Sequence, residues 1–163
     1  MNSFTVKIWD DEGQRCTLYT VQKEGSNDSE TDKFFLKAKK NEKLKRNFQE
    51  LATFLTDIIG DQDGALPIYF REEQQAHALP PKKSIEKNSI TFFHLNYPLR
   101  LYCLRISNTI LVLFNGDEKT SETAQDGKTS MVFYEALQFT ECILKAYLNK
   151  EFQFDQDQEI FLP

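Results

Sequence analysis

Cationic side chains stand in or beside two hydrophobic strands predicted in the second half of the chain. Arg100 and Arg105 interrupt the segment 99–107, and Lys119 follows the segment 108–116. Guanidinium and ammonium groups bind phosphate oxygens and stabilise the negative charge that develops when a phosphodiester is cleaved. These residues are therefore the first candidates for a site that binds or cleaves a phosphate ester.

Strand geometry separates the two arginines. Side chains alternate between the faces of a strand, so Arg100 shares a face with Tyr102 while Arg105 lies on the other. One explanation is ordinary: an arginine near a sheet edge covers apolar surface with its stem and pairs with a carboxylate such as Glu118. The other is functional: Arg100 and Lys119 point into one groove and bind phosphate there.

His94 is the nearest residue whose pKa range suits proton transfer near neutral pH. It lies in an aromatic segment with Phe92, Phe93 and Tyr97, and Tyr102 follows on the next predicted strand. Bases of single-stranded RNA stack on such rings, although an aromatic strand is more often part of a core. We therefore treat Tyr102 as a candidate RNA contact.

Composition bounds the class of protein. The chain has 163 residues, of which 40% are hydrophobic and 14 are phenylalanine, so we expect one domain over 1–163 with a substantial core. Its net charge of −5 argues against binding nucleic acid by overall charge alone. No signal peptide, membrane span, metal-binding spacing or cofactor motif is visible, so we expect a cytoplasmic protein without a metal or cofactor.

Hydrophobic periodicity predicts the order of the elements. Residues 3–22 form an N-terminal β-hairpin; helices follow at 33–41 and 42–60; a proline-containing loop elaboration spans about 61–89; strands cover 90–97, 99–107 and 108–116; a helix covers 131–151; and the tail adds a short strand. Thr31 or Asp32 is the predicted N-cap of the first helix, and Gly60 the predicted stop of the second.

This order indicates an α+β fold with a mostly antiparallel central sheet. An N-terminal helical pair and a C-terminal helix pack on that sheet, and we expect the helices on one of its faces. The segment 108–116 is apolar without alternation, which predicts a central strand buried on both sides.

The stretch "LRLYCLRISNTILVLFNGDEKTSETA" resembles the central strands of RelE/HigB-like toxins of bacterial type II toxin–antitoxin systems. It shares with them an arginine-containing strand, a turn, an apolar strand and a basic segment, after a helical pair and before a last helix. The resemblance implies an mRNA interferase, a ribosome-dependent endoribonuclease without metal. It also implies mRNA, the ribosome and a cognate antitoxin protein as partners.

Residue by residue, the resemblance implies four assignments. Arg100 matches the strand arginine that contacts the scissile phosphate, and Arg105 matches a second strand arginine. Lys119 and Thr120 match the basic segment that touches phosphate or ribosomal RNA. Arg100, Lys119 and His94 are then the expected catalytic residues. Arg105 and Thr120, together with Tyr102, are the expected RNA contacts.

The chain also departs from that pattern. Asp117 and Glu118 stand beside Lys119, and no tyrosine or histidine follows in "SETAQDGKTS" to transfer a proton. Two alternatives follow. One is a non-catalytic protein- or RNA-binding module on the same scaffold, a degenerate toxin; the other is an unrelated small enzyme that uses His94.

Overall fold

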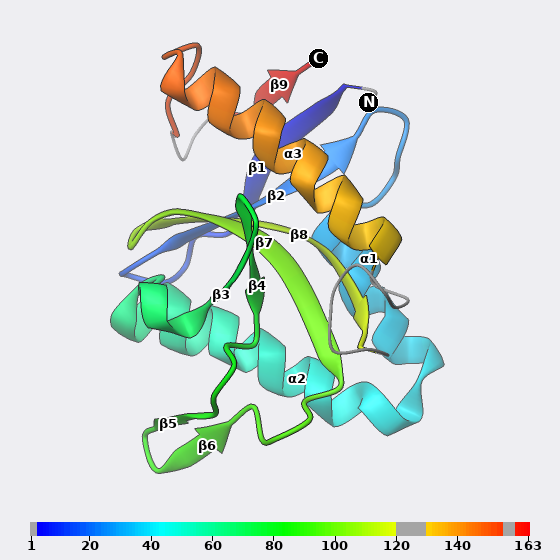
Figure 1. The fold of residues 1–163 in the computed structure, drawn as a ribbon, viewed down its shortest axis with the longest axis vertical. Helices are drawn as coiled ribbons and strands as arrows, with labels where there is room; N and C mark the ends of the chain where they lie inside the picture. The colour runs from blue at the N-terminus through cyan, green and yellow to red at the C-terminus, as the bar shows by residue number, and fades with distance from the viewer. Residues whose placement is uncertain (1–2, 120–129, 155–158) are drawn as a thin grey trace.

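A computed structural model describes residues 3–119, 130–154 and 159–163 (Figure 1). It is an α+β structure in which seven strands form one mostly antiparallel sheet, in the order β3-β4-β7-β8-β2-β1-β9, and β5 and β6 form a separate ribbon. The strands are β1 (Phe4–Asp10), β2 (Thr17–Lys23), β3 (Arg71–Glu73), β4 (Ala76–Leu79), β5 (Ile85–Lys87), β6 (Ile90–Phe92), β7 (Leu99–Ser107), β8 (Ile110–Glu118) and β9 (Ile160–Leu162).

The helical segments are α1 (Glu30–Leu36), the 3₁₀ turns η1 (Lys37–Lys40) and η2 (Glu42–Leu44), α2 (Lys45–Thr53), the π-helical continuation η3 (Phe54–Asp63), the 3₁₀ turn η4 (Pro67–Tyr69) and α3 (Ser130–Leu148). Strand β8 is central: it pairs antiparallel with β7 and parallel with β2. The predicted central position of this segment is therefore confirmed.

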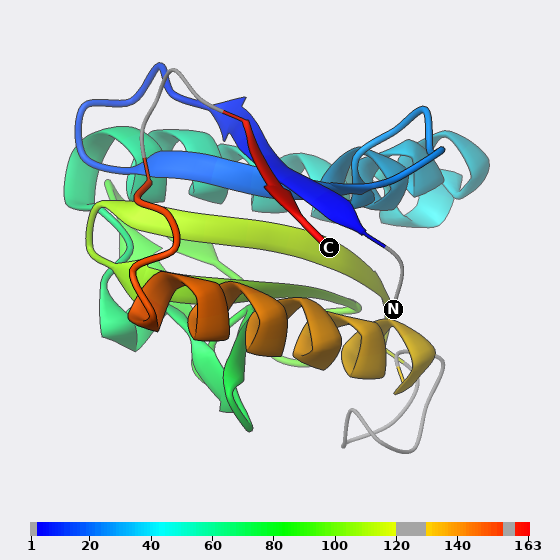
Figure 2. The ribbon, with the colours of Figure 1, turned by 90° about the horizontal axis from the view of Figure 1, so that it is seen from above.

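Helices cover both faces of the sheet, so the prediction that all pack on one face is wrong. Phe34 of α1 and Leu51 of α2 share a buried cluster with Leu101, whereas Phe133 of α3 belongs to a second cluster with Tyr102. Figure 2 shows α1 and α2 on one side of the strands and α3 on the other. Strands that are apolar on both faces need two covering layers, and one helical layer would leave half of that surface in water.

The third helix is amphipathic rather than uniformly apolar. Phe133, Phe139 and Ile143 are buried against the sheet, while the polar residues Gln138, Glu141 and Lys145 are exposed. Within the part of the chain that the structure describes, no helix has the length and apolar character needed to cross a membrane.

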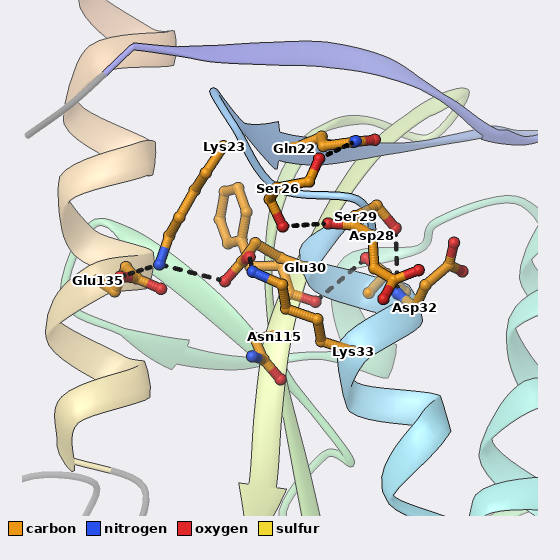
Figure 3. A network of polar contacts seen from close by, with 12 residues as sticks. Gln22, Lys23, Ser26, Asp28, Ser29, Glu30, Asp32, Lys33, Asn115 and Glu135 are labelled. Atoms are coloured by element: carbon orange, nitrogen blue, oxygen red, sulfur yellow. Dashed lines mark hydrogen bonds and ion pairs between the residues drawn. The ribbon is translucent and has the colours of Figure 1, made fainter.

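A polar network fixes α1 to its neighbours (Figure 3). The N-cap is Ser29, whose hydroxyl accepts a hydrogen bond from the Asp32 amide at 3.1 Å, so the predicted caps were wrong. Buried Glu30 accepts from Lys33 Nζ at 2.7 Å and lies 3.8 Å from Lys23 Nζ, and Lys23 also contacts Glu135 of α3 at 2.6 Å. The network therefore links β2 to a helix on each side of the sheet.

The second helix does not stop at Gly60 but continues through Asp63 to Gly64, which has a φ of +85°. Gly60 has a different role, because its carbonyl oxygen accepts the amides of Arg15 and Cys16 at 2.8 and 3.0 Å. A Cβ on Gly13 would lie 2.2 Å from that oxygen. The glycine at position 60 therefore belongs to a close contact between helix and hairpin rather than to a helix end.

Segment 61–89 differs most from the predicted loop. It supplies the edge strands β3 and β4, and β4 pairs with β7, with Ala78 opposite Tyr102 and Leu79 opposite Leu101. The strand predicted over 90–97 ends at Phe92 and gives way to a turn. Both differences shape the site, because the new strands and the turn surround the beginning of β7.

Candidate anion-binding site

A cavity of about 700 Å³ lies where β7 begins and β8 ends. We call it the basic pocket. Its lining comes from β3, the segment after β4, the turn after β6, the start of β7 and the residue after β8. The lining residues are Arg71, Pro80, Pro81, Lys82, Lys83, Ser84, Phe93, His94, Leu95, Asn96, Tyr97, Leu99, Arg100 and Lys119.

Backbone pairing brings these segments together. The amide of Lys119 donates to the Pro98 carbonyl at 2.7 Å, which holds the residue after β8 beside the start of β7. Arg71 of β3 lies opposite Ala78 of β4, which lies opposite Tyr102 of β7, so Arg71 and Arg100 lie on one face of the sheet. The three expected catalytic residues, Arg100, Lys119 and His94, therefore line one pocket.

The charge of the lining is one-sided. Arg71, Lys82, Lys83, Arg100 and Lys119 are cationic, and none of the lining residues that the structure describes is an aspartate or glutamate. This arrangement contrasts with the net charge of −5 of the whole chain. A cavity lined by one sign of charge concentrates ions of the opposite sign, so the local arrangement favours an anionic ligand.

Arg100 is the central group of the pocket. It is only 1% exposed, and its Nε and Nη2 atoms are buried without a hydrogen-bond partner among the described residues. Among the described residues, Glu73 Oε1 lies 3.8 Å from Nη1, which is an ion-pair distance but too long for a hydrogen bond. Because a guanidinium stays charged in proteins, these unpaired donors raise the free energy of the site. Both atoms are covered in this structure, so a phosphate accepts from them only once the side chain turns toward the pocket, which would lower that free energy.

Three further cationic residues support this geometry. Arg71 Nε donates to the Pro80 carbonyl at 2.9 Å, which fixes that guanidinium at the wall of the pocket. Lys82 and Lys83 are exposed at the entrance. Sequence reasoning missed all three residues, although the doublet after Pro80 and Pro81 was a visible signal of local positive charge.

The acidic residues next to Lys119 are held outside the pocket. Asp117 lies opposite Arg100 in the β7–β8 register, yet its carboxylate is 3.8 Å from Lys37 Nζ of η1. Lys37 also donates to the Gly116 carbonyl at 2.6 Å. Burial lowers the pKa of Lys37, while Asp117 and Glu30 act in the opposite direction. Lys37 thus provides Asp117 with a partner other than Arg100.

This pairing gives a testable role to Lys37. We expect Lys37→Met to weaken phosphate binding about fivefold, because Asp117 then compensates the charge of Arg100 from across the strands. Asp117→Asn in the same background should restore the affinity, and Lys39→Met, at an exposed position of the same turn, should leave it unchanged. Isothermal titration with inorganic phosphate measures all four proteins. Unchanged binding by Lys37→Met would contradict this role.

The groups available for proton transfer are few. His94 is exposed on the turn after β6 and lines the pocket. Tyr97 also lines it, but its hydroxyl donates to the Asn47 carbonyl, and burial together with Glu50 raises its pKa well above the usual range. Tyr97 therefore stays protonated at neutral pH, and His94 is the better placed of the two.

Other predicted RNA contacts lie elsewhere. Tyr102 is completely buried and packs on Phe133 with 5.5 Å between ring centroids, so it presents no face on which a base could stack. Arg105 does not line the basic pocket; its Nε donates to the Ala65 carbonyl at 2.6 Å. Thr120 lies outside the described residues.

Comparison with known proteins adds no relative. No protein-family model matches the chain, and no curated protein or solved structure is significantly similar to it. Within the described residues, no group of three histidine, cysteine or acidic side chains is placed to hold a metal ion. A proposal of function therefore rests on the residues that line the basic pocket.

Proposed function

We propose that the protein binds single-stranded RNA in the basic pocket and cleaves it without a metal ion, as a toxin-like endoribonuclease of a RelE/HigB-like toxin–antitoxin pair. One observation carries the proposal: Arg100, whose Nε and Nη2 are buried without a partner among the described residues, lines a pocket with Lys119 and His94. RNA supplies the matching chemistry, because its phosphates are anionic and its 2′-hydroxyl is a nucleophile within reach of the adjacent phosphorus.

The proposed reaction is an internal transfer. The 2′-oxygen attacks phosphorus, the bond to the 5′-oxygen breaks, and the products are a 2′,3′-cyclic phosphate and a 5′-hydroxyl. His94 accepts the 2′-hydroxyl proton, and water supplies the proton that the leaving oxygen gains. Arg100 and Lys119 stabilise the additional negative charge of the pentacoordinate intermediate. On a ribosome, the mRNA would be aligned by the ribosome itself, which reduces what the protein must supply.

A second function is favoured by a specific observation. His94 is exposed, and Tyr97 is engaged with a backbone carbonyl, so the pocket offers strong phosphate binding but few groups for proton transfer. A non-catalytic RNA-binding module on the same scaffold would have this character. In that case RNA binds in the pocket and leaves it intact.

The two functions are separated by one experiment. The purified protein is incubated with single-stranded RNA in EDTA, alone and in a translating extract, and the products are examined for cyclic phosphate ends. We expect cleavage in EDTA, and a loss of at least tenfold in rate with His94→Ala. In bacteria, induction should arrest growth, and Arg100→Ala should relieve the arrest.

The contrary outcomes are distinct. Binding without cleavage under both conditions would favour the binding module. An absence of RNA binding would exclude both functions. Cleavage that disappears in EDTA and returns with a divalent cation would contradict the metal-independent mechanism.

A further inference from the structure

The turn between β6 and β7 forms the rim of the basic pocket. Its two ends are buried: Phe93 is 3% exposed and packs on Phe54 of η3 with 4.8 Å between ring centroids. Its amide donates to Glu50 Oε2 at 3.1 Å, and the Tyr97 ring packs on Phe93 at 5.0 Å. Both ends of the turn are therefore fixed on the second helix.

The backbone of this turn is held in an uncommon conformation. Phe93 has a φ of +61° and Asn96 a φ of +63°, in the left-handed region that bulky residues rarely adopt. Such conformations persist only where the surroundings impose them, and they cluster at functional sites and ligand clamps. Here the buried ends impose the conformation, and the three residues between them project outward.

Those three residues offer a chemistry that the rest of the pocket lacks. His94, Leu95 and Asn96 are exposed and line the pocket, and Leu95 is 90% exposed. An imidazole and an isobutyl group provide flat or apolar surface, and a carboxamide both donates and accepts hydrogen bonds. A phosphate can bond the imidazole and the carboxamide but not the isobutyl group, so anion binding alone leaves the exposed Leu95 without a role. A nucleobase can use Leu95 and Asn96, through apolar contact with its face and hydrogen bonds to its edge, while His94 acts on the adjacent ribose.

We propose that the His94–Asn96 turn is a nucleobase subsite, which binds the base next to the phosphate held by Arg100 and sets the base preference of the site. The inference rests on the proposed function, because it assigns the substrate of the same pocket. It requires an unpaired base, since the edge that Asn96 would read is occupied in a duplex. The ligand is therefore single-stranded RNA with a favoured base at one position.

The test compares two polyanions, of which one carries bases and the other carries none. Affinities of the wild type and Leu95→Ala are measured for a single-stranded RNA oligomer and for inorganic polyphosphate. We expect Leu95→Ala to weaken RNA binding about fivefold and to leave polyphosphate binding unchanged within twofold. Ile90→Ala is the matched control: Ile90 is also an exposed aliphatic residue, on β6 and outside the pocket lining.

A second variant tests base preference without disturbing the fold. Glycine adopts a positive φ at little cost, so Asn96→Gly keeps the turn and removes only the carboxamide. We expect the wild type to bind one of four homo-oligomers at least fivefold better than the weakest, and Asn96→Gly to reduce that ratio below twofold.

Three results would overturn the inference. Equal weakening of RNA and polyphosphate by Leu95→Ala, or no change in either, would show that the turn contacts no base. A base preference that survives Asn96→Gly would place the reading of the base elsewhere. A wild type that binds polyphosphate but not RNA would overturn the proposed function together with the subsite, and is thereby distinguished from the first two results.

Discussion

Arg100→Met is expected to weaken phosphate and RNA binding about 100-fold while leaving the protein at least as stable as the wild type. The side chain is 1% exposed, and its Nε and Nη2 atoms have no hydrogen-bond partner among the described residues. Each buried donor left unpaired costs about 1–3 kcal/mol, and a methionine of similar length removes that cost while it keeps the apolar stem. A ligand that pairs with those donors loses its strongest contacts.

Arg105→Met provides the matched control on the same strand. Its guanidinium donates to the carbonyl of Ala65 at 2.6 Å and to Asn108, so it is part of the folded structure rather than of the basic pocket. We expect this variant to lose about 1 kcal/mol of unfolding free energy and to bind phosphate as the wild type does. Arg100→Met should thus lose binding and keep its stability, whereas Arg105→Met should lose stability and keep its binding.

Thermal denaturation with and without inorganic phosphate measures both effects. Phosphate should raise the midpoint of the wild type and of Arg105→Met, because a ligand that binds only the native state stabilises it. It should not raise the midpoint of Arg100→Met. A destabilised Arg100→Met that still responds to phosphate would contradict the role of Arg100 as the central anion-binding group.

The difference between these arginines shows what sequence reasoning can reach. Side-chain alternation correctly placed Arg100 and Arg105 on opposite faces of β7. It did not reveal that Arg100 is buried. The simpler of the two explanations placed this arginine near a sheet edge, with its guanidinium in water. The cover comes from β3 and β4, whose three- and four-residue strands lie in a segment with three prolines and were predicted as loop.

Elements with a long hydrophobic pattern were predictable, and short ones were not. The apolar runs of β7 and β8 carry their own signal, and the absence of alternation in β8 correctly predicted a central strand. The same observation implied two covering layers, which the predicted single helical layer did not supply. The short strand β4 forms because β7 offers it a partner, and β3 then pairs with β4 at the edge of the sheet. This is a tertiary effect, which local propensity does not contain.

The candidate site was predictable only where its residues belong to the long hydrophobic strands or lie close to them in the sequence. Arg100, Lys119 and His94 lie within a span of 26 residues. The family resemblance selected Arg100 and Lys119, the chemistry of imidazole selected His94, and in the structure all three line one pocket. Arg71 and the doublet Lys82 and Lys83 come from the segment predicted as loop, so nothing in the sequence placed them beside Arg100. Tyr102, the predicted RNA contact, lies in the core instead, because its strand is buried on both faces.

Gly116→Ala is expected to cost about 3 kcal/mol of unfolding free energy and to abolish binding at the basic pocket. A Cβ at this position would lie 2.1 Å from the Arg100 carbonyl oxygen, 2.8 Å from the Leu101 Cα and 2.9 Å from the Phe34 ring. The pairing of β7 and β8 shifts register here, and the irregularity brings the two backbones too close for a side chain. A methyl group must therefore push β7 away at the residue that carries the central guanidinium.

Gly13→Ala separates the loss of stability from the loss of the site. Its Cβ would lie 2.2 Å from the Gly60 carbonyl oxygen, an equally severe contact in a region that contributes nothing to the pocket lining. Both variants should therefore unfold at a lower temperature by about 6–12 °C. At a temperature where both are folded, only Gly116→Ala should fail to bind inorganic phosphate. Equal affinities for phosphate in the two variants would mean that the position of the β7 backbone at Arg100 does not control the site.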